Sequence, residues 1–174
     1  MRRVIHYKGV KRVTFILISV SLIVAAYFIY LSVAPRQAYF HRVASTALLE
    51  EELGGVRLAQ SIKSITPSPR PTHDNELYDY YTMDNGMTLA TRLNDDKIIR
   101  IIAFSDSRMK TFKGIGVGHT TKDILAAYGS YYYNRGEQGA RIIGYVDKRN
   151  HSSLEFWLQD DEVQMIRYDI DSMK

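Results

Sequence analysis

The sequence predicts an α+β protein: an N-terminal transmembrane helix followed by two repeated modules, each a short helix packed on an antiparallel β-meander. Three observations lead to this prediction: a long uncharged apolar run, two blocks that repeat in the same order, and capped helices that precede groups of strands. The predicted boundaries are a cytoplasmic stub at 1–12, a transmembrane signal anchor at 13–34, a helical stalk at 35–54, and modules at 55–105 and 106–174. The stalk either prolongs the membrane helix or packs on the sheet.

The apolar run extends from Val13 to Ala34 without a charged side chain. At about 1.5 Å per residue, a helix of this length covers roughly 33 Å, enough to cross the hydrocarbon core of a bilayer. Residues 1–12 carry five basic side chains and no acidic one, so the positive-inside bias predicts that this end stays cytoplasmic. The sequence therefore predicts a single-pass protein of the cell membrane that contacts the lipid bilayer through residues 13–34. Its C-terminal part is predicted to be extracytoplasmic.

The formal charge of +4 comes from 23 basic and 19 acidic residues. Five of the basic residues lie in the predicted stub, which leaves 18 basic against 19 acidic residues in the remainder, a net charge of −1. This distribution does not predict a nucleic-acid-binding surface. The absence of cysteine excludes disulfides and thiolate metal sites, and it fits an exported bacterial domain that is stabilised by its core alone.

Two blocks of the sequence match later blocks. Residues 55–65 align with 114–124, and residues 80–101 align with 145–166, with glycine, lysine, leucine and isoleucine at matching places. Internal repeats of this kind indicate a duplicated structural unit. A single divergent domain is the alternative, and the sequence alone leaves it open.

Each block begins with a glycine turn and a cap for a short helix. Thr120, followed three residues later by Asp123, predicts a capping box at the start of a helix over 121–128 that stops at the next glycine. Ser61 is predicted to cap the corresponding helix of the first module. The proline-rich segment 67–71 cuts that helix short, because proline cannot continue a helix.

Three strands are expected after each helix. They are predicted at 77–83, 87–93 and 97–104 in the first module, and at 139–146, 153–159 and 163–169 in the second. The link Asp84-Asn85-Gly86 predicts a tight hairpin, since Asn-Gly accepts positive φ angles. Leu154 and Phe156 alternate with Glu155 and Trp157, which predicts a sheet with one covered face and one open face.

The glycine-rich segment 114–118 raises the question of a phosphate-binding loop. Its spacing is neither G-x-G-x-x-G nor GxxxxGK[ST], and a helix followed by antiparallel hairpins is not a βαβ unit. We therefore predict a structural turn and no cofactor. The five histidines lack ligand spacing, so no metal site is predicted. The pairs Asp95-Asp96 and Asp160-Asp161 are predicted turn residues rather than an acid/base pair, and no catalytic residue or enzymatic activity is predicted.

The segments Gly116-Val117-Gly118-His119-Thr120, Asp123-Ile124 and Tyr128-Gly129, continued by Leu154-Glu155-Phe156 and Asp161-Glu162-Val163, resemble a known unit. It is similar to the helix-plus-meander module of the small outer-membrane assembly lipoproteins of the SmpA/OmlA kind, and to the tandem modules of β-lactamase inhibitory protein. The resemblance covers about 55–174 and implies a protein-binding module with two sheets side by side. The chain departs from these families in having no cysteine and in its predicted signal anchor. The resemblance implies no partner-contact residue.

The predicted function is a non-enzymatic protein-interaction module of the bacterial cell envelope, whose partner is another envelope protein. Alternation places some aromatic residues on the open face, and exposed Tyr and Trp are enriched at binding hot spots. The candidate binding residues are Tyr78, Tyr81, Tyr132 and Trp157. The alternative for these residues is that tyrosines merely fill strands. The alternative function is a cell-wall or small-ligand (carbohydrate) binding module.

Overall fold

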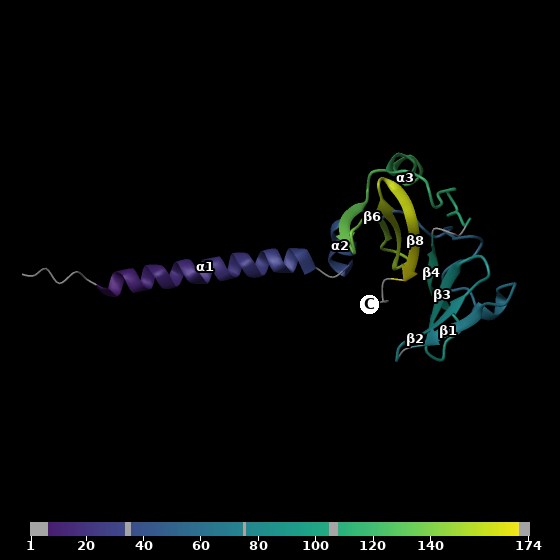
Figure 1. Ribbon diagram of the computed structural model, residues 1–174, viewed down its shortest axis with the longest axis horizontal. Coiled ribbons are helices and arrows are strands. Elements are labelled where there is room, and N and C mark those ends of the chain that lie inside the picture. Colours follow the sequence, from purple (N-terminus) through teal and green to yellow (C-terminus); the bar gives the residue numbers. More distant parts are fainter. Residues whose placement is uncertain (1–6, 34–35, 75, 105–107, 171–174) are drawn as a thin grey trace, which may run out of the picture. The chain divides into compact units, whose positions relative to one another are not determined.

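The computed structural model describes residues 7–33, 36–74, 76–104 and 108–170. The chain divides into two units, Met1–Ala38 and Tyr39–Lys174. The first unit contains helix α1 (Tyr7–Val33), and helix α2 (Arg36–Arg42) crosses the boundary between the units. The second unit is built on an eight-stranded sheet, shown in Figure 1.

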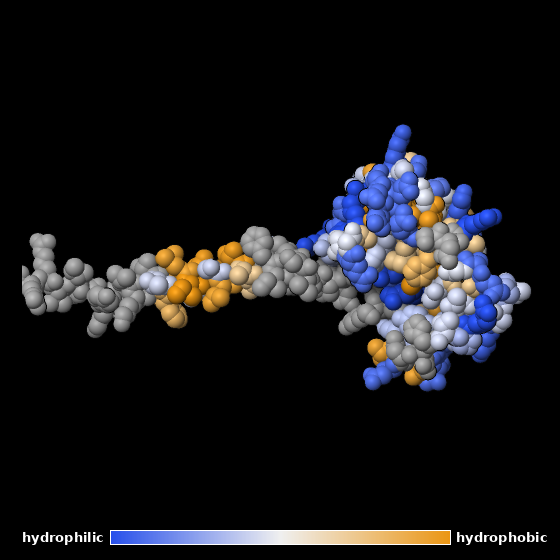
Figure 2. All heavy atoms as spheres, viewed as in Figure 1, coloured by the Kyte–Doolittle hydropathy of each residue, from blue (hydrophilic) through white to orange (hydrophobic). Residues whose placement is uncertain are grey.

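The described side chains of α1 run from Thr14 to Tyr27, and most are hydrophobic and exposed (Figure 2). No helix in the described part of the chain is long and apolar enough to cross a membrane. The predictions of a transmembrane signal anchor and of a single-pass location in the cell membrane are therefore wrong. Residues 1–6 of the predicted stub lie outside the described residues.

Helix α2 ends at Arg42, although the helical pattern of the predicted stalk continues to residue 53. The reason lies in tertiary hydrogen bonds that occupy the backbone beyond the helix. The N–H of Thr46 donates to the carbonyl of Val146 at 2.7 Å, and the N–H of Leu48 donates to the Asp147 carboxylate at 2.9 Å. Backbone groups satisfied in this way do not need helical partners.

The sheet consists of two four-stranded meanders. The strands are β1 (Arg70–Asp74), β2 (Tyr78–Thr82), β3 (Met87–Arg92), β4 (Ile98–Ala103), β5 (Tyr133–Glu137), β6 (Ala140–Asp147), β7 (Ser152–Gln159) and β8 (Glu162–Ile170). The order is β1-β2-β3-β4-β8-β7-β6-β5, and every neighbouring pair is antiparallel. The six predicted strands are confirmed as β2–β4 and β6–β8. The edge strands β1 and β5 were not predicted, because β1 contains proline and β5 is mostly polar and contains a glycine.

The two meanders share a single hydrophobic core. One cluster of buried side chains contains Met87 and Ile101 from the first meander together with Phe156 and Ile166 from the second. Two separate modules would each need a core of their own. The predicted pair of repeated helix-plus-meander modules is therefore wrong, because the strands join at β4–β8 into one continuous sheet.

The first predicted module also lacks its α-helix. Residues Ile62–Ser64 form a single 3₁₀ turn, η1, which the Ser61 hydroxyl caps by accepting from the Lys63 N–H at 3.3 Å. Ile65 is already extended, with ψ of 132°. Thr66 precedes Pro67, and a residue before proline disfavours the helical region, so the turn stops after three residues.

The second helix is confirmed as α3 (Thr121–Tyr128). Its capping box is present: the Thr120 N–H donates to the Asp123 carboxylate at 2.8 Å, and the Asp123 N–H donates back to the Thr120 hydroxyl. The bond from the Thr120 backbone lowers the pKa of Asp123. Gly129 closes the helix with φ of 84°. The glycine segment before the cap is a turn, because Gly114 and Gly118 have φ of 84° and 82°.

Candidate functional site

The sheet has two unlike faces. We call the face that carries Phe156 the core face, and the face that carries Glu155 and Trp157 the open face. Helix α3 and the turn η1 both pack on the core face. At the β5–β6 end of the open face, the ring of Tyr39 stacks on Tyr133 with centroids 5.4 Å apart.

The structure places the four predicted binding residues on both faces. Tyr81 and Tyr132 pack against the main core cluster, and the Tyr132 ring lies 6.2 Å from that of Tyr145. Tyr78 is half-buried in a separate cluster on the open face, and Trp157 is on the same face but only 7% exposed. The strands of Tyr78 and Trp157 are separated by β3, β4 and β8. The four residues therefore form no single patch, and their binding role stays a prediction.

Trp157 is covered by two arginines. The guanidinium carbons of Arg135 and Arg167 lie 5.5 and 5.1 Å from its ring centroid, within the range of a cation–π contact. The indole N–H donates to the Glu155 carboxylate at 3.3 Å. These contacts explain why the largest side chain of the open face is buried.

Six charged side chains of alternating sign cross the open face, and we call them the charge chain. In spatial order they are Glu137, Arg135, Glu155, Arg167, Asp169 and Arg100. Arg167 donates to Glu155 at 2.6 Å, and Arg135 donates to the same carboxylate at 3.0 Å. Arg100 holds Asp169 through two bonds of 2.7 and 2.9 Å. The charge chain thus links β5, β7, β8 and β4, and it crosses the junction between the two meanders.

Most of the charge chain is buried, and its three acidic side chains balance its three arginines. The side chains of Glu155 and Asp169 are fully buried, whereas those of Arg135 and Arg167 are 9% and 15% exposed. Buried charges are costly unless they are paired and hydrogen-bonded, and each of these carboxylates contacts two guanidinium groups. Burial lowers the pKa of Arg135, but its bonds to Glu155 and Glu137 outweigh burial and raise that pKa overall.

A glycine makes room for the fourth residue that donates a hydrogen bond to Glu155. Tyr133, Gly144, Glu155 and Arg167 lie directly opposite one another on four successive strands. The Tyr133 hydroxyl donates to Glu155 across β6. A Cβ at Gly144 would lie 2.1 Å from the Tyr133 ring, so any larger residue would displace the tyrosine. Gly144 is therefore part of the charged network although it carries no side chain.

This arrangement is suited to holding strands together rather than to acid–base chemistry. Both buried carboxylates already accept bonds from guanidinium groups, whereas a general base needs access to a substrate proton. In the ranges 7–33, 36–74, 76–104 and 108–170, no three His, Asp or Glu residues are placed to hold a metal ion.

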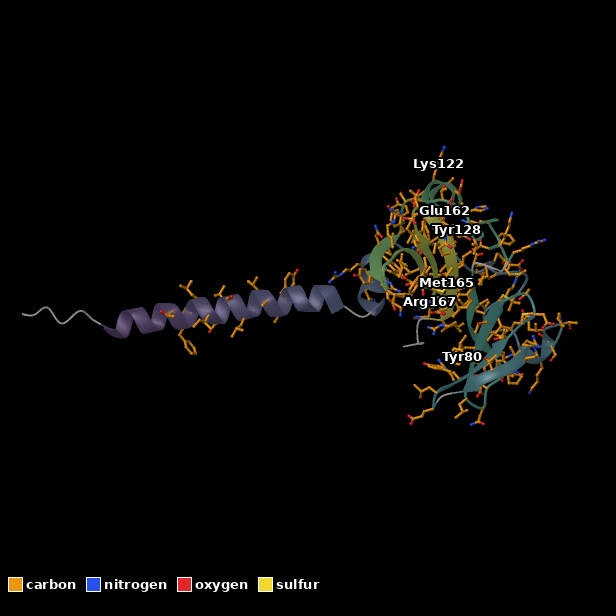
Figure 3. The ribbon with its side chains drawn as sticks, viewed as in Figure 1. Tyr80, Lys122, Tyr128, Glu162, Met165 and Arg167 are labelled. Atoms are coloured by element: carbon orange, nitrogen blue, oxygen red, sulfur yellow. The ribbon has the colours of Figure 1, made fainter. Side chains whose placement is uncertain are left out.

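A strip of half-buried side chains lies beside the charge chain, and we call Tyr80, Ile102, Met165 and Arg167 the open-face strip. Ile102 is directly opposite Arg167, and Met165 is opposite Trp157. Tyr80 is opposite Ala90, which is in turn opposite Arg100 on the next strand. Figure 3 shows Met165 and Arg167 close together on β8, with Tyr80 on the other meander.

Sequence reasoning missed the open-face strip and most of the charge chain. Strand β4 is an almost continuous apolar run, which hides its two faces, and a register shift changes the alternation between Ile98 and Arg100. The available signal was a charged residue inside each of β4, β7 and β8. Only the register reveals that Arg100, Glu155 and Asp169 share one face.

A further buried acid lies beneath the core face. Glu51, which is 4% exposed, accepts from the Tyr128 hydroxyl at 2.8 Å and from the Phe112 N–H at 2.7 Å. Burial raises the pKa of Glu51, and the bonds from Tyr128 and Phe112 oppose part of that rise. The carboxylate therefore fastens α3 to two loops that cover the core face.

The chain matches no protein-family model, no curated protein and no solved structure. The resemblance to the assembly lipoproteins and to β-lactamase inhibitory protein therefore stays a prediction.

Proposed function

We propose that the chain is a non-enzymatic protein-interaction module whose partner contacts the open-face strip. The observation that carries the proposal is a set of half-buried aromatic, aliphatic, methionine and arginine side chains on a sheet face where neither α3 nor η1 packs. Aromatic residues, Met and Arg are enriched at the centres of protein interfaces. Methionine also adapts its shape to irregular partner surfaces.

The charge chain supports the proposal by fixing the strip in place. Arg167 is held by Glu155 and packs on Trp157, so little side-chain freedom remains to be lost when a partner binds. The strip also crosses the junction between the two meanders, since Ile102 and Arg167 belong to neighbouring strands of different meanders.

Two earlier expectations are not part of this proposal. The assignment to the cell envelope and the bilayer contact rested on the predicted membrane anchor, which the structure does not support. The carbohydrate-binding alternative needs an aromatic ring free to stack on a sugar. Trp157 does not support the carbohydrate-binding alternative, because two guanidinium groups lie over its ring.

The test compares Met165→Glu with the matched control Lys122→Glu, which introduces the same side chain on exposed α3, away from the strip (Figure 3). Full-length protein is crosslinked in lysate, the recovered protein is identified and purified, and its Kd is measured for the wild type and both variants. We expect Met165→Glu to weaken binding at least tenfold and the control to change it less than twofold. Equal affinities for all three proteins, or recovery of glycans alone, would overturn the proposal.

A further inference from the structure

We infer that the outer edge of β5 binds an extended segment of a partner protein, which adds to the sheet as a further strand. The inference rests on the proposed function in that the ligand is a protein. It concerns a different surface from the open-face strip, and it is carried by two independent observations on β5. One is the contrast between the two edges of the sheet, and the other is a glycine that the chain's own fold does not require.

The two edge strands are protected to different degrees. Strand β1 contains Pro71, which has no N–H to donate, and its register with β2 shifts between Pro71 and His73. Proline and irregular pairing are devices that keep another strand from adding to an edge. Strand β5 has no proline, and it pairs with β6 over five consecutive residues without a shift. The β5 edge is thus regular enough to accept a strand.

The turn after β5 identifies the backbone groups that point outward. Gln138 and Gly139, with φ of 52° and 82°, form a two-residue turn flanked by the pair Glu137 and Ala140. The pair that flanks such a turn is hydrogen-bonded, and bonding alternates along an antiparallel ladder. The N–H and C=O groups of Asn134 and Gly136 therefore point away from β6. Both residues are exposed, and a shallow hollow runs along this hairpin.

Gly136 has no function within the chain's own packing. Its φ is not positive, and a Cβ added there would meet only the Ala140 carbonyl oxygen, at an ordinary 3.8 Å. Gly144 differs, because a Cβ at that position would collide with Tyr133. Glycine inside a strand weakens the strand, and it often marks a place where another backbone approaches closely. Gly136 is therefore explained by an approaching strand.

The occupant we infer is a different protein rather than a second copy of this chain. If two copies of β5 paired through both outward-facing residues, Arg135 of one copy would lie opposite Arg135 of the other. Like charges placed directly opposite destabilise a strand pair. Tyr131, 67% exposed and two residues before β5, offers an aromatic contact for an apolar side chain of the added strand.

The probe is a phage-displayed library of random linear 12-residue peptides, selected on the full-length chain. For each selected peptide, amide hydrogen exchange is measured at Asn134 and Gly136 in the wild-type protein. We expect protection of at least tenfold at these two amides and none at β1. A library that yields no peptide protecting them would overturn the inference, whether or not peptides bind elsewhere.

The matched variants are Gly136→Pro, which removes the outward N–H, and Gly136→Ala, which keeps it. We expect Gly136→Pro to raise the Kd of the selected peptides at least tenfold. Gly136→Ala keeps the N–H but adds a Cβ where the strand approaches, so it should raise their Kd by a smaller factor of about three, with far-UV circular dichroism confirming that both variants fold. Equal binding by both variants contradicts strand addition. Met165→Glu should leave these peptides bound, so failure of the open-face proposal and failure of this inference are distinguishable.

Discussion

The core face packs Tyr145, Leu154 and Phe156 against α3, whereas the open face of the same strands buries Glu155 and Asp169. Apolar burial on the core face is non-directional and depends mainly on volume. The charge chain depends on direction, since each carboxylate needs its guanidinium groups at hydrogen-bond distance. The two faces of one sheet are thus stabilised in different ways. Substitutions on the core face should lower stability through lost volume, and those on the open face through unpaired charge.

The largest effect is expected for Phe156→Ala on the core face. Phe156 is fully buried, with its ring 5.4 Å from that of Tyr128, so truncation leaves a cavity under α3. We expect a loss of about 4 kcal/mol in the free energy of unfolding, measured by urea denaturation. Met165→Ala on the half-buried strip is the control and should cost clearly less. Similar costs for both would remove the distinction between the faces.

On the open face, Glu155→Gln should cost about 3 kcal/mol, because it leaves Arg135 and Arg167 buried without their shared carboxylate. The size and shape of the side chain barely change, so the loss reports charge rather than volume. Glu137 belongs to the same charge chain, but its carboxylate is 40% exposed, so Glu137→Gln should cost less than about 1 kcal/mol. If Glu155→Gln were neutral in urea denaturation, the charge chain would not stabilise the open face.

The close contact between Gly144 and the Tyr133 ring gives a further test of how the open face is stabilised. Gly144→Ala should cost about 2 kcal/mol, because the new methyl group displaces the Tyr133 ring and with it a donor to Glu155. Gly136→Ala, where there is room, should stay within about 0.5 kcal/mol of the wild type. A double-mutant cycle with Tyr133→Ala measures the coupling, which should be absent if Gly144 acts only through backbone flexibility.

The smallest expected effect is a pH dependence from Glu51. Its pKa in the folded protein is raised above the ordinary value of 4.5, so the folded state binds more protons than the unfolded state between those two pKa values. The contribution of Glu51 to stability is therefore largest below pH 4.5 and falls as the pH rises through the raised pKa.

The measurement for Glu51 is the difference in unfolding free energy between the wild type and Glu51→Gln at a series of pH values. This difference should shift against the wild type as the pH rises from 4 to 7. Taking the difference cancels acids whose pKa is lowered, such as Asp123, which act in the opposite direction. A difference that is constant with pH would contradict the role assigned to burial at Glu51.

Local signals in the sequence correctly predicted the elements whose formation depends on short segments. The Thr120–Asp123 capping box, helix α3 and six of the eight strands were predicted, as was the turn at Asp160-Asp161. Each depends on residues within a few positions of one another, such as a hydroxyl reaching the N–H three residues later. The assignment of β7 side chains to two faces was also readable, because Leu154 and Phe156 alternate with Glu155 and Trp157. The burial of both faces was not predicted.

Tertiary structure alone decided how these segments combine. The pairing of β4 with β8 joins Arg100 to Asp169, which are 69 positions apart, and it converts two predicted modules into one sheet with one core. Long-range hydrogen bonds from Thr46 and Leu48 to β6 also ended α2 early. The physical reason is that strand register and long-range hydrogen bonds depend on distant partners, and a one-residue shift in register exchanges the two faces of a strand.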